Sequence, residues 1–238
     1  MVKQRHPRFV DDEDSEVTSL EAIARGPSAE QVAEAIRSGI CPSDRFFDQF
    51  FPYDLQRVSG QHWTQLSVAL RVAEWLTGAS VKSVVDVGSG AGKFCVAAAL
   101  ASRCSFIGIE QRPRLVEAAR ALARIFDVDD RVRFVEAAIS HSVVPAADAY
   151  YLYNPFGENL FGSAERLGDD VELGLERYER DIAFMEEFFE RAPVGIYVIK
   201  YNGFGGRMPR SYDEVIVDRA MPNMLRMWRK SRAGAAAW

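Results

Sequence analysis

Short apolar runs and amphipathic stretches alternate along most of the chain. The runs are rich in β-branched or aromatic residues and predict buried strands at residues 83–87, 105–109, 132–135, 147–153 and 195–201. Between them, apolar residues spaced three to four apart predict helices over residues 93–102, 113–126 and 171–189. This alternation indicates an α/β fold with a mostly parallel sheet.

The last of these helices has the longest regular pattern. Its apolar positions step by four and three, at Val171, Leu175, Tyr178, Ile182, Met185 and Phe189. The stripe predicts one helix face packed against the sheet, with acids and arginines on the outside.

The first 60 residues have a different pattern. Ser28 and Gln31 match a capping box, and Val32, Ile36 and Ile40 at a spacing of four predict a helix that follows Ser28. Five aromatic residues then cluster between positions 46 and 53, at Phe46, Phe47, Phe50, Phe51 and Tyr53. The cluster can be a substrate-pocket wall or part of the core, and the sequence leaves both interpretations open.

A glycine-bearing turn follows the first strand. Residues 84–94 read Val-Val-Asp-Val-Gly-Ser-Gly-Ala-Gly-Lys-Phe, with glycine at 88, 90 and 92. Glycines at such a turn let a ligand approach the main chain closely. The dinucleotide pattern Gly-x-Gly-x-x-Gly is excluded because position 93 is lysine, and a P-loop is excluded because Val87 and Phe94 occupy two of its required positions.

An acidic residue stands about 20 positions after the turn, where the second strand ends. This is Glu110. In doubly wound folds an acid at this place accepts hydrogen bonds from the ribose hydroxyls of an adenosine ligand. The order strand, glycine turn, helix, strand and acid therefore predicts an adenosine-binding site.

The motif Asp86-x-Gly88-x-Gly90-x-Gly92, with Glu110 in register, resembles the first motif of the class I S-adenosylmethionine-dependent methyltransferases. The resemblance covers about residues 60–230. It implies a Rossmann-like fold with a seven-stranded, mostly parallel sheet, a C-terminal antiparallel hairpin from residues 212–217 and 223–229, and a helical N-terminal extension. It also implies S-adenosyl-L-methionine as cofactor. The residues expected to contact it are Thr64, Asp86, Gly88, Ser89, Gly90, Gly92, Glu110, Gln111, Ala138 and Asn154.

This resemblance divides the chain into three parts. Residues 1–18 are expected to form a flexible acidic arm, residues 19–60 a helical extension or lid, and residues 61–238 the methyltransferase domain. Ala138 stands where many family members carry the aspartate that binds the adenine amino group. Either main-chain groups and Glu136 or shape alone would then recognise the base.

The fourth strand ends at Asn154-Pro155-Phe156-Gly157, on the edge where parallel sheets bind ligands. This run partly resembles the Asn/Asp-Pro-Pro-aromatic motif of amino-group methyltransferases and the Asn-Asn-Phe end of the non-SET histone-lysine methyltransferases. Phe156 and Gly157 depart from the former motif, and a plain Asn-Pro turn is the alternative. The resemblance implies a nitrogen acceptor, with Asn154, Tyr153 and Tyr201 as the catalytic residues.

Gly60 to Thr64 precede a further helix, for which Thr64 is the expected N-cap. The start of this helix resembles the one that lies beside the methionine end of the cofactor in many amino-group methyltransferases, where free amides suit a carboxylate. His62 is a candidate base, and a structural role is the alternative.

Composition limits the class of protein. The chain has 238 residues and a net charge of −5, which disfavours nucleic acid and favours a small-molecule or protein acceptor. The basic residues Arg226, Arg229, Lys230 and Arg232 are interpreted as a solvated edge. Three sparse cysteines indicate neither a metal site nor a disulfide framework, and no run is apolar enough for a membrane helix. We expect a cytoplasmic protein, and nothing in the sequence sets its oligomeric state.

Two other functions fit the same cofactor site. One is attack at the aminopropyl carbon of S-adenosylmethionine, which transfers or cyclises that group and releases methylthioadenosine. The other is a non-catalytic subunit that binds S-adenosylmethionine. Identification of the nucleoside product separates them from methyl transfer.

Overall fold

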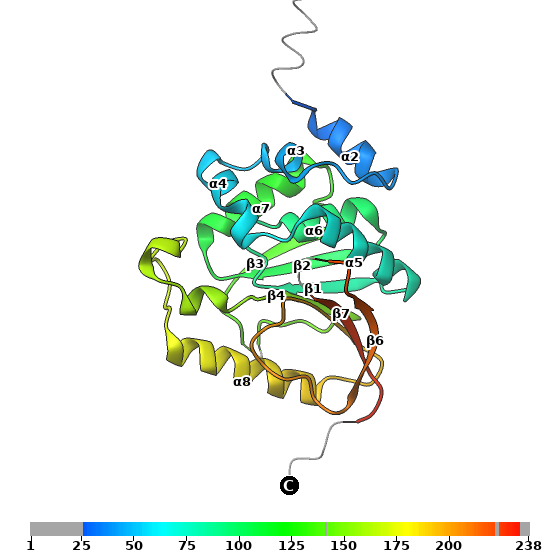
Figure 1. Ribbon diagram of the computed structural model, residues 1–238, viewed down its shortest axis with the longest axis vertical. Helices are drawn as coiled ribbons and strands as arrows, with labels where there is room; N and C mark the ends of the chain where they lie inside the picture. Colours follow the sequence, from blue (N-terminus) through cyan, green and yellow to red (C-terminus); the bar gives the residue numbers. More distant parts are fainter. Residues whose placement is uncertain (1–25, 141, 222–223, 234–238) are drawn as a thin grey trace, which may run out of the picture.

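A seven-stranded sheet forms the centre of the protein (Figure 1). The structure is a computed structural model that describes residues 26–140, 142–221 and 224–233. The strand order is β3-β2-β1-β4-β5-β7-β6. The strands are β1 (Ser83–Val87), β2 (Ser105–Glu110), β3 (Val132–Glu136), β4 (Ala149–Tyr153), β5 (Tyr197–Tyr201), β6 (Tyr212–Asp218) and β7 (Leu225–Lys230). The first five are parallel and β7 is antiparallel to both neighbours, which confirms the predicted fold.

Helices cover both faces of this sheet. Helices α5 (Leu66–Gly78), α6 (Lys93–Ala101) and α7 (Pro113–Ile125) lie on one face, and α8 (Leu175–Arg191) lies on the other (Figure 1). Helix α6 is buried at nearly every position because it packs between the sheet and the N-terminal helices. Pro113 occupies the first turn of α7, as expected, because proline lacks the amide proton that a helix start leaves unpaired.

Helix α8 differs from its prediction in two respects. It begins at Leu175, so Val171 lies outside it, and Leu175 itself is 61% exposed. The prediction that its acids and arginines lie outside is wrong for Arg177 and Asp181. Both are buried, and Arg177 Nε lies 2.7 Å from Asp181 Oδ2. The ion pair satisfies each charge locally, which is the condition for burying a charged pair.

The described part of the N-terminal extension packs on the same core as the α/β domain. It contains α2 (Ala29–Arg37), α3 (Asp44–Asp48) and α4 (Tyr53–His62). The Ser28 capping box is confirmed, and Val32 and Ile36 are buried. Ile40 was expected on the same face, but it follows the end of the helix and is 62% exposed. The predicted acidic arm lies outside the described residues, and the division at residue 60 stays a prediction.

The aromatic cluster between residues 46 and 53 contributes to this packing. Phe47 stacks on Phe126 at the end of α7, with ring centroids 4.7 Å apart, and Phe50 meets the same ring edge-on. Phe46 and Tyr53 are exposed. These contacts favour the core interpretation over the pocket wall.

A buried lysine joins the extension to the glycine turn. Lys93, the first residue of α6, has its Nζ 2.6 Å from Asp44 Oδ1 and 2.7 Å from Asp48 Oδ1. The same Nζ donates a hydrogen bond to Ser59 Oγ at 3.2 Å. Because the ammonium is buried and both carboxylates come from the extension, these contacts fix helices α3 and α4 next to the candidate site described below.

Candidate active site

The glycine turn lies at the carboxyl end of β1, between the ends of β2 and β4. Gly88 and Gly90 have φ angles of 73° and 54°, which side-chain-bearing residues rarely adopt. A Cβ at Gly88 would lie 2.8 Å from Pro155, and one at Gly90 would overlap the ring of Trp63. A Cβ at Gly92 would lie 2.6 Å from Phe134 and 2.8 Å from Ala119, so glycine here allows close packing, and its contact with the cofactor stays a prediction. Gly92 is not among the residues that line the crevice described next.

Glu110 holds the turn in place. Its Oε2 accepts a hydrogen bond from the Gly90 amide at 3.0 Å, and its Oε1 accepts one from the Arg112 amide at 2.9 Å. Burial raises the pKa of this carboxyl group, and the amide hydrogen bonds and the Arg112 charge oppose the rise. A carboxylate has about four lone-pair sites, so acceptor capacity remains for a ligand.

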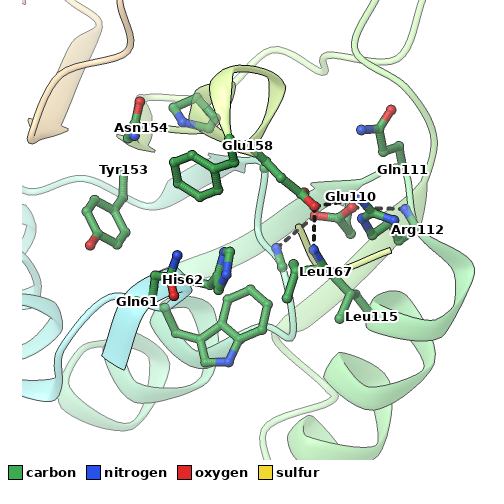
Figure 2. A pocket seen from close by; sticks show the side chains of 15 residues that line it. Gln61, His62, Glu110, Gln111, Arg112, Leu115, Tyr153, Asn154, Glu158 and Leu167 are labelled. Atoms are coloured by element: carbon green, nitrogen blue, oxygen red, sulfur yellow. Dashed lines mark hydrogen bonds and ion pairs between the residues drawn. The ribbon is translucent and has the colours of Figure 1, made fainter. Parts of the chain in front are cut away.

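One crevice connects Glu110 to the end of β4 (Figure 2). Figure 2 shows Gln111 and Arg112 near Glu110, with Tyr153 and Asn154 on the opposite side of the view. The floor and walls include Gly88, Gly90, Trp63, His62 and Gln61. The structure therefore brings together the predicted residues Gly88, Gly90, Glu110, Gln111, Tyr153 and Asn154.

Asn154 has a strained backbone at the end of β4. Its φ is 40°, and its amide donates to the Gly203 carbonyl at 2.9 Å. The side-chain amide lies against Gly157, where a Cβ would overlap it. No other described residue forms a hydrogen bond with that amide. Such strain is often found at functional sites, where surrounding contacts hold it.

The other two predicted catalytic residues lie at different depths. Tyr153 lines the crevice. Tyr201 is only 1% exposed and is not among the lining residues, although its ring centroid is 4.9 Å from that of Tyr153. Tyr201 therefore packs behind Tyr153 rather than lining the crevice itself.

Thr64, Asp86 and Ser89 line a small recess beside the turn. The prediction that Thr64 caps the next helix is wrong, because Gln65 is the N-cap and the Thr64 hydroxyl is 2.9 Å from the Tyr151 hydroxyl. The Leu66 amide at that helix start donates to Asp44 Oδ1 at 3.0 Å. A carboxylate of the protein thus already occupies part of the place expected for the cofactor's carboxylate.

A sequence comparison agrees with this geometry. Residues 79–149 match the model of a family described as a methyltransferase domain. The match contains the glycine turn and Glu110, and the seven-stranded sheet around it has the parallel strands and antiparallel hairpin that the class I resemblance implies. Residues 79–149 thus resemble a methyltransferase domain, and they lie within a Rossmann-like, mostly parallel sheet. No curated protein matches the chain at a significant level.

Solved methyltransferases share the fold of this domain. An O-methyltransferase from Bacillus cereus in complex with S-adenosylhomocysteine is 9% identical, with a TM-score of 0.52 over 84% of this chain and 97% of the other. A mitomycin 7-O-methyltransferase is 14% identical, with a TM-score of 0.52 over 92% and 67%. An RNA methyltransferase from Salinibacter ruber, also with S-adenosylhomocysteine, is 21% identical, with a TM-score of 0.48 over 70% and 95%.

Several polar groups of the methyltransferase domain suit S-adenosylmethionine. The Ser89 hydroxyl and the Trp63 indole nitrogen are buried without a hydrogen-bond partner among the described residues. Glu110 retains acceptor capacity, and the glycine turn exposes main-chain atoms. The crevice volume is about 100 Å³. Pockets for ligands of this size commonly measure about 300–1,000 Å³. We therefore expect Trp63 and the segment between β4 and α8, part of which lines the crevice, to move when the cofactor binds.

That segment lies between β4 and α8 and was missed by sequence reasoning. It contains η1 (Gly157–Leu160) and η2 (Ser163–Glu165). Arg112 Nη2 donates to Glu158 Oε1 at 2.8 Å (Figure 2) and to the Gly168 carbonyl at 3.1 Å. Asp170 forms a second ion pair with Arg112. Arg112, two residues after the ribose-binding candidate, therefore fastens the segment. No periodicity or motif in the sequence indicates these contacts.

His62 also lines the crevice, and its ring meets that of Phe161 edge-on, with ring centroids 5.9 Å apart. Burial lowers the pKa of His62. Nearby Glu158 raises this pKa, and Arg112 lowers it further. The imidazole is therefore neutral at pH 7, as a base requires.

Asp86 gives the domain a predicted pH dependence of stability. Burial raises its pKa from 3.8 to about 7, while Cys95 Sγ donates to Oδ2 at 3.3 Å. Between these pH values the folded state keeps a proton that the unfolded state releases, so stability falls as pH rises and levels off above about 7. We expect the stability of the wild type relative to Asp86→Asn to fall by about 1 kcal/mol between pH 5 and pH 6. Urea unfolding over a pH series measures this, and a difference independent of pH would contradict it.

The part of the chain that the structure describes has no helix long and apolar enough to cross a membrane. Nor do its histidine, cysteine and acidic side chains form a group of three or more that could hold a metal ion.

Proposed function

We propose that this domain transfers the methyl group of S-adenosylmethionine to a nitrogen atom of a small molecule or a protein side chain. One observation carries the proposal. Glu110 and Asn154 stand at two ends of a single crevice with the glycine turn between them. This spacing suits a nucleoside whose sugar lies at Glu110 and whose sulfur lies near Asn154.

The cofactor end of the crevice would act by binding and orientation. S-adenosylmethionine supplies a methyl carbon that is already activated by positive sulfur. Glu110 would accept hydrogen bonds from the ribose hydroxyls, and the main chain at Gly88 and Gly90 would lie against the methionine portion. Ser89 and Asp86, in the adjoining recess, are available to its polar groups. Orientation of reactants can contribute roughly 7 to 11 kcal/mol to catalysis.

The acceptor end would align the nucleophile. The Asn154 side-chain oxygen can accept a hydrogen bond from the acceptor N–H, which directs the nitrogen lone pair toward the methyl group. Tyr153 lines the same end of the crevice. Neutral His62, on the opposite wall, is available to take the proton that the amine releases.

The comparisons support the cofactor more than the acceptor. The Bacillus cereus protein, which shares the fold, holds S-adenosylhomocysteine, the product that methyl transfer leaves. That protein and the mitomycin enzyme methylate oxygen according to their names. The nitrogen acceptor rests on the Asn-Pro-Phe-Gly end of β4, and the net charge of −5 favours acceptors other than nucleic acid.

The test is to identify the nucleoside product. Purified protein is incubated with S-adenosylmethionine and matched panels of primary amines, lysine-containing peptides and phenols, and the products are resolved by mass spectrometry. The proposal expects S-adenosylhomocysteine with amine acceptors. If S-adenosylhomocysteine forms with phenols alone, the proposal that the acceptor is a nitrogen atom is contradicted. Methylthioadenosine would indicate attack at the aminopropyl carbon, and unchanged but bound cofactor would indicate a binding subunit.

A further inference from the structure

A second recess opens beside Glu110, toward α8. Its volume is about 50 Å³, and it is lined by the ends of β2 and β3, by the start of the segment after β4, and by α8. Gln111 and Ala138 are among its residues. Since Glu110 belongs to both this recess and the main crevice, a nucleoside whose sugar is held at Glu110 would place its base here.

One carboxylate from α8 faces this recess. Asp181 lines it together with Arg177, and Asp181 is 6% exposed. Arg177 Nε donates to Asp181 Oδ2 at 2.7 Å. Within the described residues no other group donates a hydrogen bond to this carboxylate, so Oδ1 retains its acceptor capacity. Arg177 Nη1 also lies 3.5 Å from Glu172 Oε2, so a second carboxylate holds the guanidinium.

The other polar groups of the recess are less suited to bind the base. Asn159 is occupied, because its Nδ2 donates to the Phe156 carbonyl at 3.0 Å and its Oδ1 accepts from the Gly174 amide at 3.2 Å. Glu110 already accepts two main-chain hydrogen bonds, and the proposed function assigns its remaining acceptor capacity to the sugar. Glu136, the sequence candidate, is exposed and does not line the recess.

We propose that Asp181, oriented by Arg177, accepts a hydrogen bond from the exocyclic amino group of the cofactor's adenine. It would take the role of the aspartate that many family members carry at the position of Ala138. Asp181 would do so from α8, on the face of the sheet opposite to α5, α6 and α7. An ionised carboxylate can only accept hydrogen bonds, so it favours a 6-amino purine over a 6-oxo purine, whose oxygen would face the negative charge. This inference rests on the proposed function, because it assumes an adenosine cofactor with its ribose at Glu110.

The test compares two ligands that differ only in the base. Affinities of S-adenosylhomocysteine and S-inosylhomocysteine are measured by calorimetry for the wild type, Asp181→Asn and the control Glu179→Gln, which changes an exposed acid of the same helix. We expect the wild type and the control to prefer the adenosyl ligand by about 10- to 100-fold. Asp181→Asn should reduce this preference to less than about threefold, mainly by weakening the adenosyl ligand.

Other outcomes separate the two claims. If Asp181→Asn keeps the wild-type preference, or weakens both ligands equally as a structural defect would, the role of Asp181 is overturned while the proposed function stands. If the wild type binds neither ligand, the proposed function fails and this inference fails with it. Should Asp181→Asn not fold, as judged by thermal unfolding, Asp181→Glu keeps the charge but shifts the carboxylate, and the same loss of preference is expected.

Discussion

Replacing Asn154 with alanine is expected to lower kcat about 100-fold, because loss of alignment at a reacting centre commonly has an effect of this size. The affinity for S-adenosylmethionine should change much less, by under about threefold, since the proposed cofactor contacts lie mainly at Glu110 and the glycine turn. Single-turnover kinetics with an amine acceptor, together with calorimetry, separate the two quantities. An unchanged kcat would contradict the role of Asn154.

A matched pair of glycine variants tests the same role without removing Asn154. A Cβ at Gly157 would overlap the Asn154 side-chain amide, so Gly157→Ala should displace that amide and lower kcat in the same direction. Gly162→Ala is the control, because its Cβ would meet only Glu165 at 3.9 Å. If both variants keep wild-type kcat, the position of the Asn154 amide does not matter for the reaction.

Glu110→Ala is expected to weaken S-adenosylmethionine binding about 10- to 100-fold, the range for loss of hydrogen bonds to a charged group. The variant should also unfold at lower temperature, because the Gly90 and Arg112 amides lose their acceptor. Glu117→Ala, an exposed acid of α7, is the control and should retain full affinity. Calorimetry showing equal affinity for wild type and Glu110→Ala would remove Glu110 from the cofactor site.

Features set by local spacing were predictable from the sequence. The glycine turn, the Glu110 position and the order of strands and helices depend on short-range patterns, and the structure places them as expected. The Ser28 cap was also predictable, because both of its partners lie within one helical turn. Local rules were enough for these features, because their partners lie close in sequence.

Contacts between distant parts of the chain could not be predicted in this way. Thr64 looks like an N-cap, but its hydroxyl pairs with Tyr151, which is 87 positions away. Arg177 and Asp181 look like surface residues of α8 until the fold places them at a recess. Arg112 holds Glu158 across 46 positions, and no periodicity indicates such a pair. Thr64 and Arg112 have partners that only the tertiary fold provides, and Arg177 and Asp181, which pair within one helix, are buried by the fold.

A crystal structure of the protein with bound S-adenosylhomocysteine tests the central claim most directly. We expect both ribose hydroxyls within hydrogen-bond distance of the Glu110 carboxylate, the sulfur facing Asn154, and the Trp63 ring displaced from its place over Gly90. A nucleoside bound elsewhere, or one whose ribose does not contact Glu110, would contradict it.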